Sequence, residues 1–270
     1  MLAAQRHKLI VDEIRRLGAV RVSELTGLLS VSEMTIRRDL DVLASAGLVE
    51  KVHGGATLSG GLAAHEPGFE AKSHRQRREK EAVVVAAAGL VEPGQSIGLS
   101  AGTTTWRLAH HLGQVPDLTV VTNSIQVADV LHRTARPDLT VVLTGGVRTP
   151  SDALVGPIAV SSIRSLHLDL LILGVHGVTE EPGLTTPNLL EAETDRALVA
   201  ASAQLVVVAD HTKWGIRGLS RIAGLEEVDV FVTDSGLPAE ARTAISERAG
   251  RLVVANGREG ARRAGGDEAA

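Results

Sequence analysis

The apolar positions at the start of the chain follow a helical spacing in three consecutive segments. The first segment predicts an amphipathic helix over residues 2–17, with Gly18 as its stop. Ser23 is expected to cap a two-turn second helix, and Ser32 a longer third helix over 33–46. The side chains expected to face inward are Leu2, Leu9, Ile10, Ile14, Leu17, Leu25, Leu28, Leu29, Ile36, Leu40 and Leu43.

Two strand patterns accompany these helices. Residues 20–22 alternate apolar and basic side chains, and residues 48–55 run into the turn Gly54-Gly55. A short helix, a break at 30–31 and a longer helix are the pattern of a helix-turn-helix. The second strand and its glycine turn would then form a wing beside that motif.

The third helix presents polar side chains opposite its apolar stripe. Its N-terminus carries hydroxyls where backbone N–H groups already favour a phosphate, and arginine can bind guanine or pair with phosphate. The residues expected to contact DNA are Ser32, Met34, Thr35, Arg37 and Arg38 of this helix, with Lys51 and His53 of the wing. Periodicity alone fits a small helical domain with a solvated charged face equally well.

The rest of the chain predicts an α/β domain. Residues 58–69 are rich in Gly, Ala, Ser and Pro and have no period, which is typical of a linker. Beyond them, apolar runs alternate with helical segments, and such alternation predicts a largely parallel sheet. The expected strands are 96–99, 118–121, 139–143, 168–175, 205–209, 229–232 and 251–255. We therefore expect a domain over 1–57, a linker over 58–71, an α/β domain over 72–257 and a disordered tail over 258–270.

Polar turns follow several of the expected strands. A Gly/Thr-rich turn that opens a helix at Trp106 offers N–H groups and hydroxyls to a phosphate, although threonines that cap a helix need no ligand. Because ligands of open α/β sheets bind at the carboxyl ends of strands, these turns could converge on one crevice. The candidate ligand residues are Gly102, Thr103, Thr104, Thr105, Asn123, Gly145, Gly146, His176, Asp210 and Lys213.

Several of these candidates have a purely structural alternative. Asp210 and Lys213 could form a surface ion pair, which is the commoner fate of such a pair, and His176 could be a structural histidine. The acids Glu191, Glu193 and Asp195 are expected to form a solvated helix face.

Composition narrows the class of protein. The net charge is −4, and residues 1–57 hold eight basic against seven acidic side chains, so DNA binding must depend on the placement of charge. Aromatic residues make up 1% of the chain, which disfavours a groove that stacks single-stranded bases. The absence of cysteine excludes disulfides and thiolate sites and suits a reducing cytoplasm. No signal peptide or apolar span is visible, and we expect neither a cofactor nor a metal.

The longest ordered motifs resemble the DeoR family of bacterial transcriptional regulators. They are VSEMTIRRDL at 31–40, AGLV at 46–49 and HGGA at 53–56, followed by GTTT at 102–105, TNS at 122–124, and Asp210 and Lys213 in the form D-x-x-K. The resemblance implies DNA binding by the third helix, usually to repress a sugar-metabolism operon. It also implies a sensor domain similar in fold to ribose-phosphate isomerase, with a phosphorylated sugar or polyol bound by 102–105 and Lys213. A dimer or tetramer is implied as well.

Two other functions deserve comparison with a regulator. A sugar-phosphate isomerase or hydrolase would need a carboxylate base, and only Asp210 follows a strand end beside a basic group. The loop 174–177 carries His176 and Gly177 where the corresponding isomerase loop has paired acids, and the chain has no GxSxG or HExxH motif. A structural chromosome-binding protein would have little use for a large ligand-binding domain. We therefore expect a transcription factor and not an enzyme.

Overall fold

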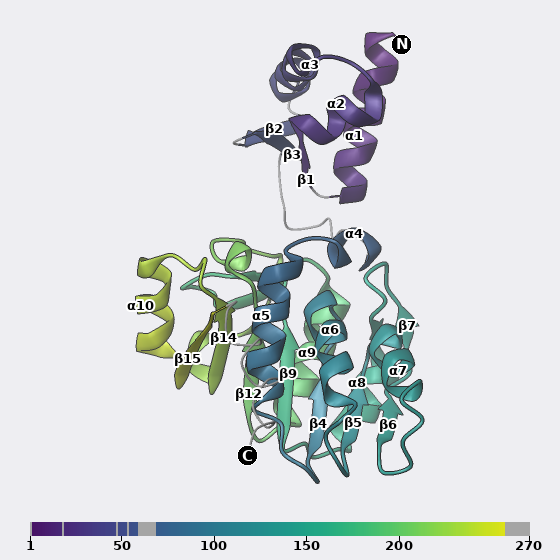
Figure 1. Ribbon diagram of the computed structural model, residues 1–270, viewed down its shortest axis with the longest axis vertical. Helices are drawn as coiled ribbons and strands as arrows, with labels where there is room; N and C mark the ends of the chain where they lie inside the picture. Colours follow the sequence, from purple (N-terminus) through teal and green to yellow (C-terminus); the bar gives the residue numbers. More distant parts are fainter. Residues whose placement is uncertain (1, 18, 47, 53, 59–68, 257–270) are drawn as a thin grey trace, which may run out of the picture. The chain divides into compact units, whose positions relative to one another are not determined.

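The computed structural model describes residues 2–17, 19–46, 48–52, 54–58 and 69–256. The chain divides into two compact units, Met1–Lys72 and Ser73–Ala270 (Figure 1).

The smaller unit is a three-helix domain with a small antiparallel sheet. Helices α2 and α3 pack together, and β3 lies between β1 and β2. Its elements are α1 (Ala3–Leu17), β1 (Ala19–Arg21), α2 (Val22–Leu29), α3 (Glu33–Ser45), β2 (Val49–Val52) and β3 (Gly55–Leu58). The core contains Ile10, Val11, Ile14, Val20, Val22, Leu25, Leu29, Ile36, Leu40, Leu43, Val49 and Ala56. This arrangement confirms the predicted winged helix-turn-helix.

Some details of the first two helices were predicted wrongly. Leu2, Leu9 and Leu28 are 71%, 45% and 59% exposed, whereas Val11 and Val22 are buried. Ser23 does not cap α2, because the backbone N–H of Arg21 donates to the Glu24 carboxylate at 2.9 Å and the helix already begins at Val22. Starting there, the stripe Val22, Leu25 and Leu29 faces the core and Leu28 faces out. Gly18 and the side chain of Leu17 lie outside the described residues.

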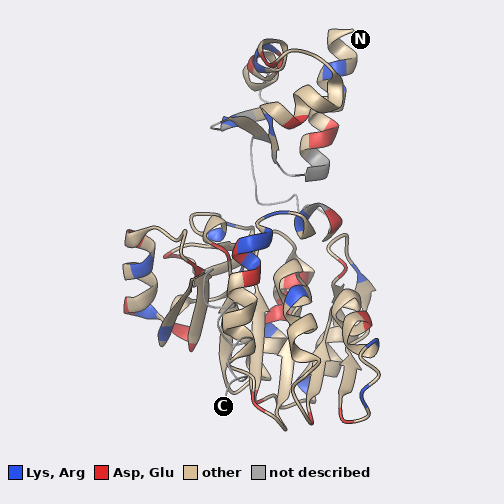
Figure 2. Ribbon diagram, in the orientation of Figure 1, with Lys and Arg blue, Asp and Glu red and all other residues tan. Residues whose placement is uncertain are grey.

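The larger unit is built on a seven-stranded sheet in which every neighbouring pair is parallel. The strand order is β15-β14-β12-β9-β4-β5-β6. The strands are β4 (Ser96–Leu99), β5 (Thr119–Thr122), β6 (Thr140–Leu143), β9 (Leu170–Gly174), β12 (Leu205–Val208), β14 (Val230–Asp234) and β15 (Arg251–Ala255). All seven predicted strands are confirmed, with ends that shift by a residue or two. Figure 2 shows that the middle of this sheet is almost free of charged residues.

Helices cover both faces of the sheet (Figure 1). Successive side chains of a strand point to opposite faces, so Leu170 and Ile172 pack with α5, α6 and α7, whereas Leu171 and Leu173 pack with α8, α9 and α10. The helices are α5 (Arg77–Ala88), α6 (Thr103–Leu112), α7 (Ile125–His132), α8 (Pro157–Arg164), α9 (Leu189–Ala200) and α10 (Ala239–Arg248). Burial on both faces explains why the central strands β9 and β12 are continuous runs of Leu, Ile and Val.

Short elements complete the unit. They are too short to show a hydrophobic periodicity, so the sequence did not predict them. A hairpin and a three-stranded antiparallel sheet of order β10-β11-β13 lie outside the main sheet. These elements are β7 (Val147–Arg148), β8 (Leu154–Val155), β10 (Gly177–Val178), β11 (Leu184–Thr186), β13 (Ser220–Ala223), and the 3₁₀ turns η1 (His211–Lys213) and η2 (Leu225–Glu227).

Both ends of the expected linker carry regular structure. Leu58 pairs with Val49 in the small sheet, and Phe69–Ser73 form the short helix α4. Residues 59–68 and the expected tail 258–270 lie outside the described residues. Within the described ranges, no helix is long and apolar enough to cross a membrane. Nor do the described side chains include three or more His, Cys, Asp or Glu grouped as metal ligands.

Candidate DNA interface and ligand site

The N-terminus of α3 is organised by two hydroxyls. The Ser32 Oγ accepts a hydrogen bond from the backbone N–H of Thr35 at 3.3 Å, and the two hydroxyl oxygens are 2.9 Å apart. The predicted cap is therefore confirmed. It leaves the first turn of α3 with backbone N–H groups directed out of the helix, which favours an anion there.

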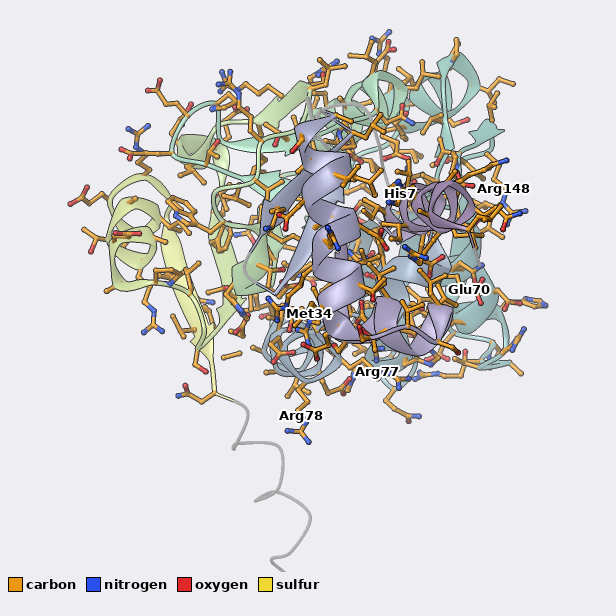
Figure 3. The ribbon with its side chains drawn as sticks, turned by 90° about the horizontal axis from the view of Figure 1, so that it is seen from above. His7, Met34, Glu70, Arg77, Arg78 and Arg148 are labelled. Atoms are coloured by element: carbon orange, nitrogen blue, oxygen red, sulfur yellow. The ribbon has the colours of Figure 1, made fainter. Side chains whose placement is uncertain are left out.

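The outer face of α3 is open to solvent. Met34 is 80% exposed and projects from the helix (Figure 3). Arg37 and Arg38 are also exposed, and Arg37 makes only a long contact of 3.5 Å with Glu33 one turn earlier. Arg38 has no ion-pair partner in the described part of the chain. An exposed pair such as Arg37–Glu33 contributes little, so both guanidinium groups can bind an external acceptor.

The opposite side of α3 carries an ion pair that the sequence analysis missed. The buried Asp39 carboxylate accepts from Arg6 Nε at 2.5 Å and Nη2 at 3.0 Å, and lies 2.8 Å from His7 Nε2. Burial alone would raise the pKa of Asp39, but the hydrogen bonds and charges of Arg6 and His7 outweigh it and lower that pKa. The signal in the sequence is an acidic residue between Ile36 and Leu40 of the buried stripe. This pair fixes α1 to α3.

The wing is tightly packed at its turn. A Cβ at Gly55 would lie 2.1 Å from the Val20 carbonyl oxygen, so this strand position requires glycine. Lys51 is exposed and binds the Asp41 carboxylate at 2.5 Å. His53, the other wing residue expected to contact DNA, lies outside the described residues.

The strand order of the larger unit contains a topological switch point between β4 and β9. From β4 the chain builds β5 and β6 on one side, and later β9, β12, β14 and β15 on the other. Adjacent connections therefore leave the sheet in opposite directions at this point, which is where open α/β sheets bind ligands. The Gly/Thr-rich turn follows β4 and lies at this point.

Hydrogen bonds hold that turn from both neighbouring strands. Gly174 N–H donates to Ser100 Oγ at 2.9 Å, and Ala101 N–H donates to Asn123 Oδ1 at 2.8 Å. Helix α6 begins at Thr103 and not at Trp106 as expected, so three threonines form its first turn. Thr103 and Thr104 are each 7% exposed and Thr105 is fully buried. The turn is thus a preformed helix N-terminus with hydroxyls around it.

The next two strands end in residues that shape this edge. Asn123 is 1% exposed and uses both amide atoms inside the protein, because its Nδ2 donates to the Leu154 carbonyl at 3.3 Å. After β6, Gly145 and Gly146 have φ values of 72° and 121°. A Cβ at Gly146 would also lie 2.5 Å from the Val155 carbonyl oxygen. Both glycines are therefore required by the backbone itself.

The end of β12 carries the remaining polar candidates. Asp210 is 2% exposed and caps η1, since its carboxylate accepts from the backbone N–H of Thr212 at 3.1 Å and from the Thr212 hydroxyl. This burial argues against the alternative of a surface ion pair with Lys213. Lys213 and His176 are half-buried. A further pair that sequence reasoning missed joins His211 Nδ1 to Asp234 at 2.8 Å.

The acids of α9 contradict the expectation of a solvated face. Glu191 and Asp195 are 7% and 9% exposed, and only Glu193 faces solvent. The Glu191 carboxylate accepts from the hydroxyls of Thr149, at 2.7 Å, and Ser151. It thereby fixes the loop between β7 and β8. The helical periodicity, which predicts that acidic side chains face solvent, could not reveal these hydrogen bonds.

Two protein-family models match the chain. The model described as the DeoR-like helix-turn-helix domain matches residues 6–59, and that of the DeoR C terminal sensor domain matches residues 75–235. One match lies in each compact unit.

Relatives of known name are similar over nearly the whole chain. An uncharacterized HTH-type transcriptional regulator of Escherichia coli, YgbI, is 38% identical over 94% of this chain and 99% of its own length. The HTH-type transcriptional regulator GlpR of Haloferax volcanii is 38% identical over 94% of this chain and 98% of its own. The glycerol-3-phosphate regulon repressor of Escherichia coli is 31% identical over 92% of this chain and 97% of its own.

Solved structures resemble the larger unit more distantly. A ribose-5-phosphate isomerase in complex with phospho-erythronic acid has a TM-score of 0.38 at 16% identity, covering 50% of this chain and 52% of that one. A similarity of this size says nothing about ligand or reaction.

Proposed function

The chain belongs to the DeoR family of transcriptional regulators, and from that membership we propose that it represses a carbohydrate-metabolism operon under the control of a phosphorylated sugar or polyol. Residues 1–57 are the proposed DNA-binding domain and residues 72–257 the proposed sensor domain. The glycerol-3-phosphate regulon repressor, named for a phosphorylated polyol, is a relative over nearly the full chain and supports this choice of ligand class.

Helix α3 is the proposed reader of DNA. Its exposed guanidinium groups offer the fork that binds guanine or phosphate, while its capped N-terminus favours a backbone phosphate. The proposed contacts are Ser32, Met34, Thr35, Arg37, Arg38, Lys51 and His53. Because readers of this type bind two half-sites of a symmetric operator, we propose that the working form is a homo-oligomer.

The preformed N-terminus of α6 at the switch point is the observation that carries the sensor proposal. Its N–H groups and threonine hydroxyls match the acceptor oxygens of a phosphate, and the proposed counter-charge is the ammonium of Lys213 in η1, which follows β12. Asn123, Gly145 and Gly146 are proposed to shape the ligand site, and His176 and Asp210 to contact the sugar.

Three compounds, each compared with and without its phosphate, test the proposal directly. The full chain selects an operator from a random-sequence DNA library, and calorimetry then compares glycerol 3-phosphate, fructose 6-phosphate and ribose 5-phosphate with glycerol, fructose and ribose. We expect a phosphorylated compound to bind and to change operator affinity, while its parent does neither. Equal binding of a sugar and its phosphate would contradict the phosphate pocket, and failure to select any DNA would contradict the reading helix.

A further inference from the structure

Helix α6 connects the proposed ligand turn to the first residue of the larger unit. The turn residues Thr103–Thr105 form its first turn, and Arg107 follows one turn later. Arg107 Nη2 donates to the backbone carbonyl of Ser73 at 3.0 Å. Ser73 ends the short helix α4 and is the point at which the chain enters the larger unit from the DNA-binding unit. One side chain thus links the helix of the ligand turn to that entry point.

The guanidinium of Arg107 is only partly satisfied. Its Nε is buried and has no hydrogen-bond partner among the described residues. The group also lies over the Trp106 ring, 5.6 Å from the ring centroid. A buried N–H without an acceptor is costly, so an arrangement that supplies one is favoured when it becomes available.

A second cation holds the same entry segment. Lys80 of α5 is 4% exposed and its Nζ donates to the Arg75 carbonyl at 2.9 Å. Between these anchors Gln76 adopts φ 48° and precedes α5. Residues 73–76 are therefore fixed by side chains that reach them from two helices, and Arg107 is the anchor on the helix that carries the ligand turn.

We propose that Arg107 is the positioning residue that couples ligand binding to DNA binding, which rests on the proposed function of the α6 N-terminus as a phosphate site. Long side chains of a helix lean toward its N-terminus, so the Arg107 guanidinium extends toward the turn that would hold the anion. A phosphate bound there attracts this guanidinium and offers it a charged acceptor, which is stronger than a backbone carbonyl. The hydrogen bond from Arg107 to the Ser73 carbonyl is then weaker when the site is occupied than when it is empty. Coupling between two sites requires such a difference between states.

The test is the substitution Arg107→Met, which keeps the apolar stem and removes the donors. Arg136→Met is its matched control, because Arg136 Nη1 also donates to a backbone carbonyl, that of Gly113 at 2.9 Å, at a place remote from β4's carboxyl end. Gel shifts measure operator affinity with and without glycerol 3-phosphate, fructose 6-phosphate or ribose 5-phosphate. We expect Arg107→Met to bind ligand more weakly, because it loses a charged donor, and, once saturated with ligand, to lose at least 80% of the ligand-induced change in operator affinity. Arg136→Met should keep it.

Each outcome decides a different statement. An undiminished response in Arg107→Met would overturn the role of Arg107 while leaving the phosphate site intact. No response of the wild type to any of the three phosphates would overturn the proposed sensor function and this inference with it. If Arg107→Met fails to fold, hydrogen exchange of the wild type still tests the inference. Ligand should then change the exchange rates of backbone amides within residues 69–80. Unchanged exchange there, alongside a normal gel-shift response, would also overturn the inference.

Discussion

Gly174 donates its backbone N–H to the hydroxyl of Ser100 at 2.9 Å, across 74 residues of sequence and across the switch point of the sheet. This bond joins the carboxyl ends of β4 and β9, next to the proposed phosphate turn. It has a counterpart at the opposite edge of the sheet, where the Ser96 hydroxyl donates to Asp169 at 2.7 Å.

The two serines make a matched pair for a first prediction. Ser100→Ala leaves the partly buried N–H of Gly174 without its acceptor and should cost about 1 kcal/mol of unfolding free energy. Because the bond also shapes the turn, phosphosugar affinity should fall about tenfold, which is equivalent to ~1.4 kcal/mol. Ser96→Ala should leave ligand affinity unchanged. Calorimetry and thermal melts measure both, and equal ligand affinity in the two variants would mean that the bond does not shape the site.

Thr104→Val and Lys213→Ala should each abolish the ligand response. Thr104→Val keeps the shape of the buried side chain and removes its hydroxyl, while Lys213→Ala removes the proposed counter-charge. A ligand at about 100 times its dissociation constant stabilises the wild type by roughly 2.7 kcal/mol, and that thermal shift should disappear. Operator affinity without ligand should stay within twofold. Thr104→Ser retains the hydroxyl and serves as control; a loss as large as that of Thr104→Val would point to packing instead.

Arg38→Ala should weaken operator binding without affecting the fold. Loss of a bidentate base contact costs about 1–3 kcal/mol and relaxes specificity at one position of the site. Arg133→Ala removes an exposed arginine of the larger unit that pairs with Asp129, and provides the comparison for a simple change in charge. Titrations against the selected operator and its single-base variants measure both effects. If Arg38→Ala binds as wild type does while circular dichroism is unchanged, α3 is not the reader.

The ion pair of Asp39 predicts a dependence of stability on pH. The folded-state pKa of Asp39 is lower than the ordinary value of 3.8 for an aspartate. Its contribution is therefore present at pH values above the unfolded pKa and is lost as pH falls through the folded pKa. The unfolding transition of the smaller unit should weaken in acid, from about pH 4 downward. Calorimetry of the full chain at several pH values measures this.

Asp39→Asn should flatten that dependence for the smaller unit. It should also destabilise the unit at neutral pH, since Arg6 and His7 lose their charged partner. Asp138, whose pKa the Arg136 hydrogen bond lowers to about 2, lies in the larger unit and gives Asp138→Asn as the control. A smaller-unit transition with the same acid dependence in wild type and Asp39→Asn would contradict the assignment.

Much of this fold follows from the sequence because its signals are local. Runs such as 205–209 are long enough and apolar enough to identify a doubly buried strand, and Ser32 marks its helix start by one hydroxyl. Errors arise where a contact is distant in sequence. Asp39 is buried because Arg6 approaches from 33 residues away, and Glu191 because Thr149 does so from 42. Helical periodicity considers only the residues of the helix that carries each acid. It contains no information about the distant partner that makes burial of a carboxylate favourable.

The candidate site shows the same division. The turn at 102–105 is recognisable from composition, whereas the amide of Asn123 is committed to Ala101 and Leu154, which only the three-dimensional arrangement reveals. The proposed role of Arg107 also depends on a backbone carbonyl 34 residues earlier, and a carbonyl has no sequence signature.

The strand order also determines the sequence in which the chain can fold during its own synthesis. β4, β5 and β6 emerge first and can pair at once, but β9 follows β4 by more than seventy residues, as the 73-residue separation of Ser96 and Asp169 shows. At about 5–20 residues per second, the ribosome needs roughly 4–15 s to deliver it. For that interval the backbone N–H and C=O groups along one side of β4 are unpaired, and such an edge is a template for pairing with another nascent chain. Slower translation between β6 and β9 should therefore increase the aggregated fraction.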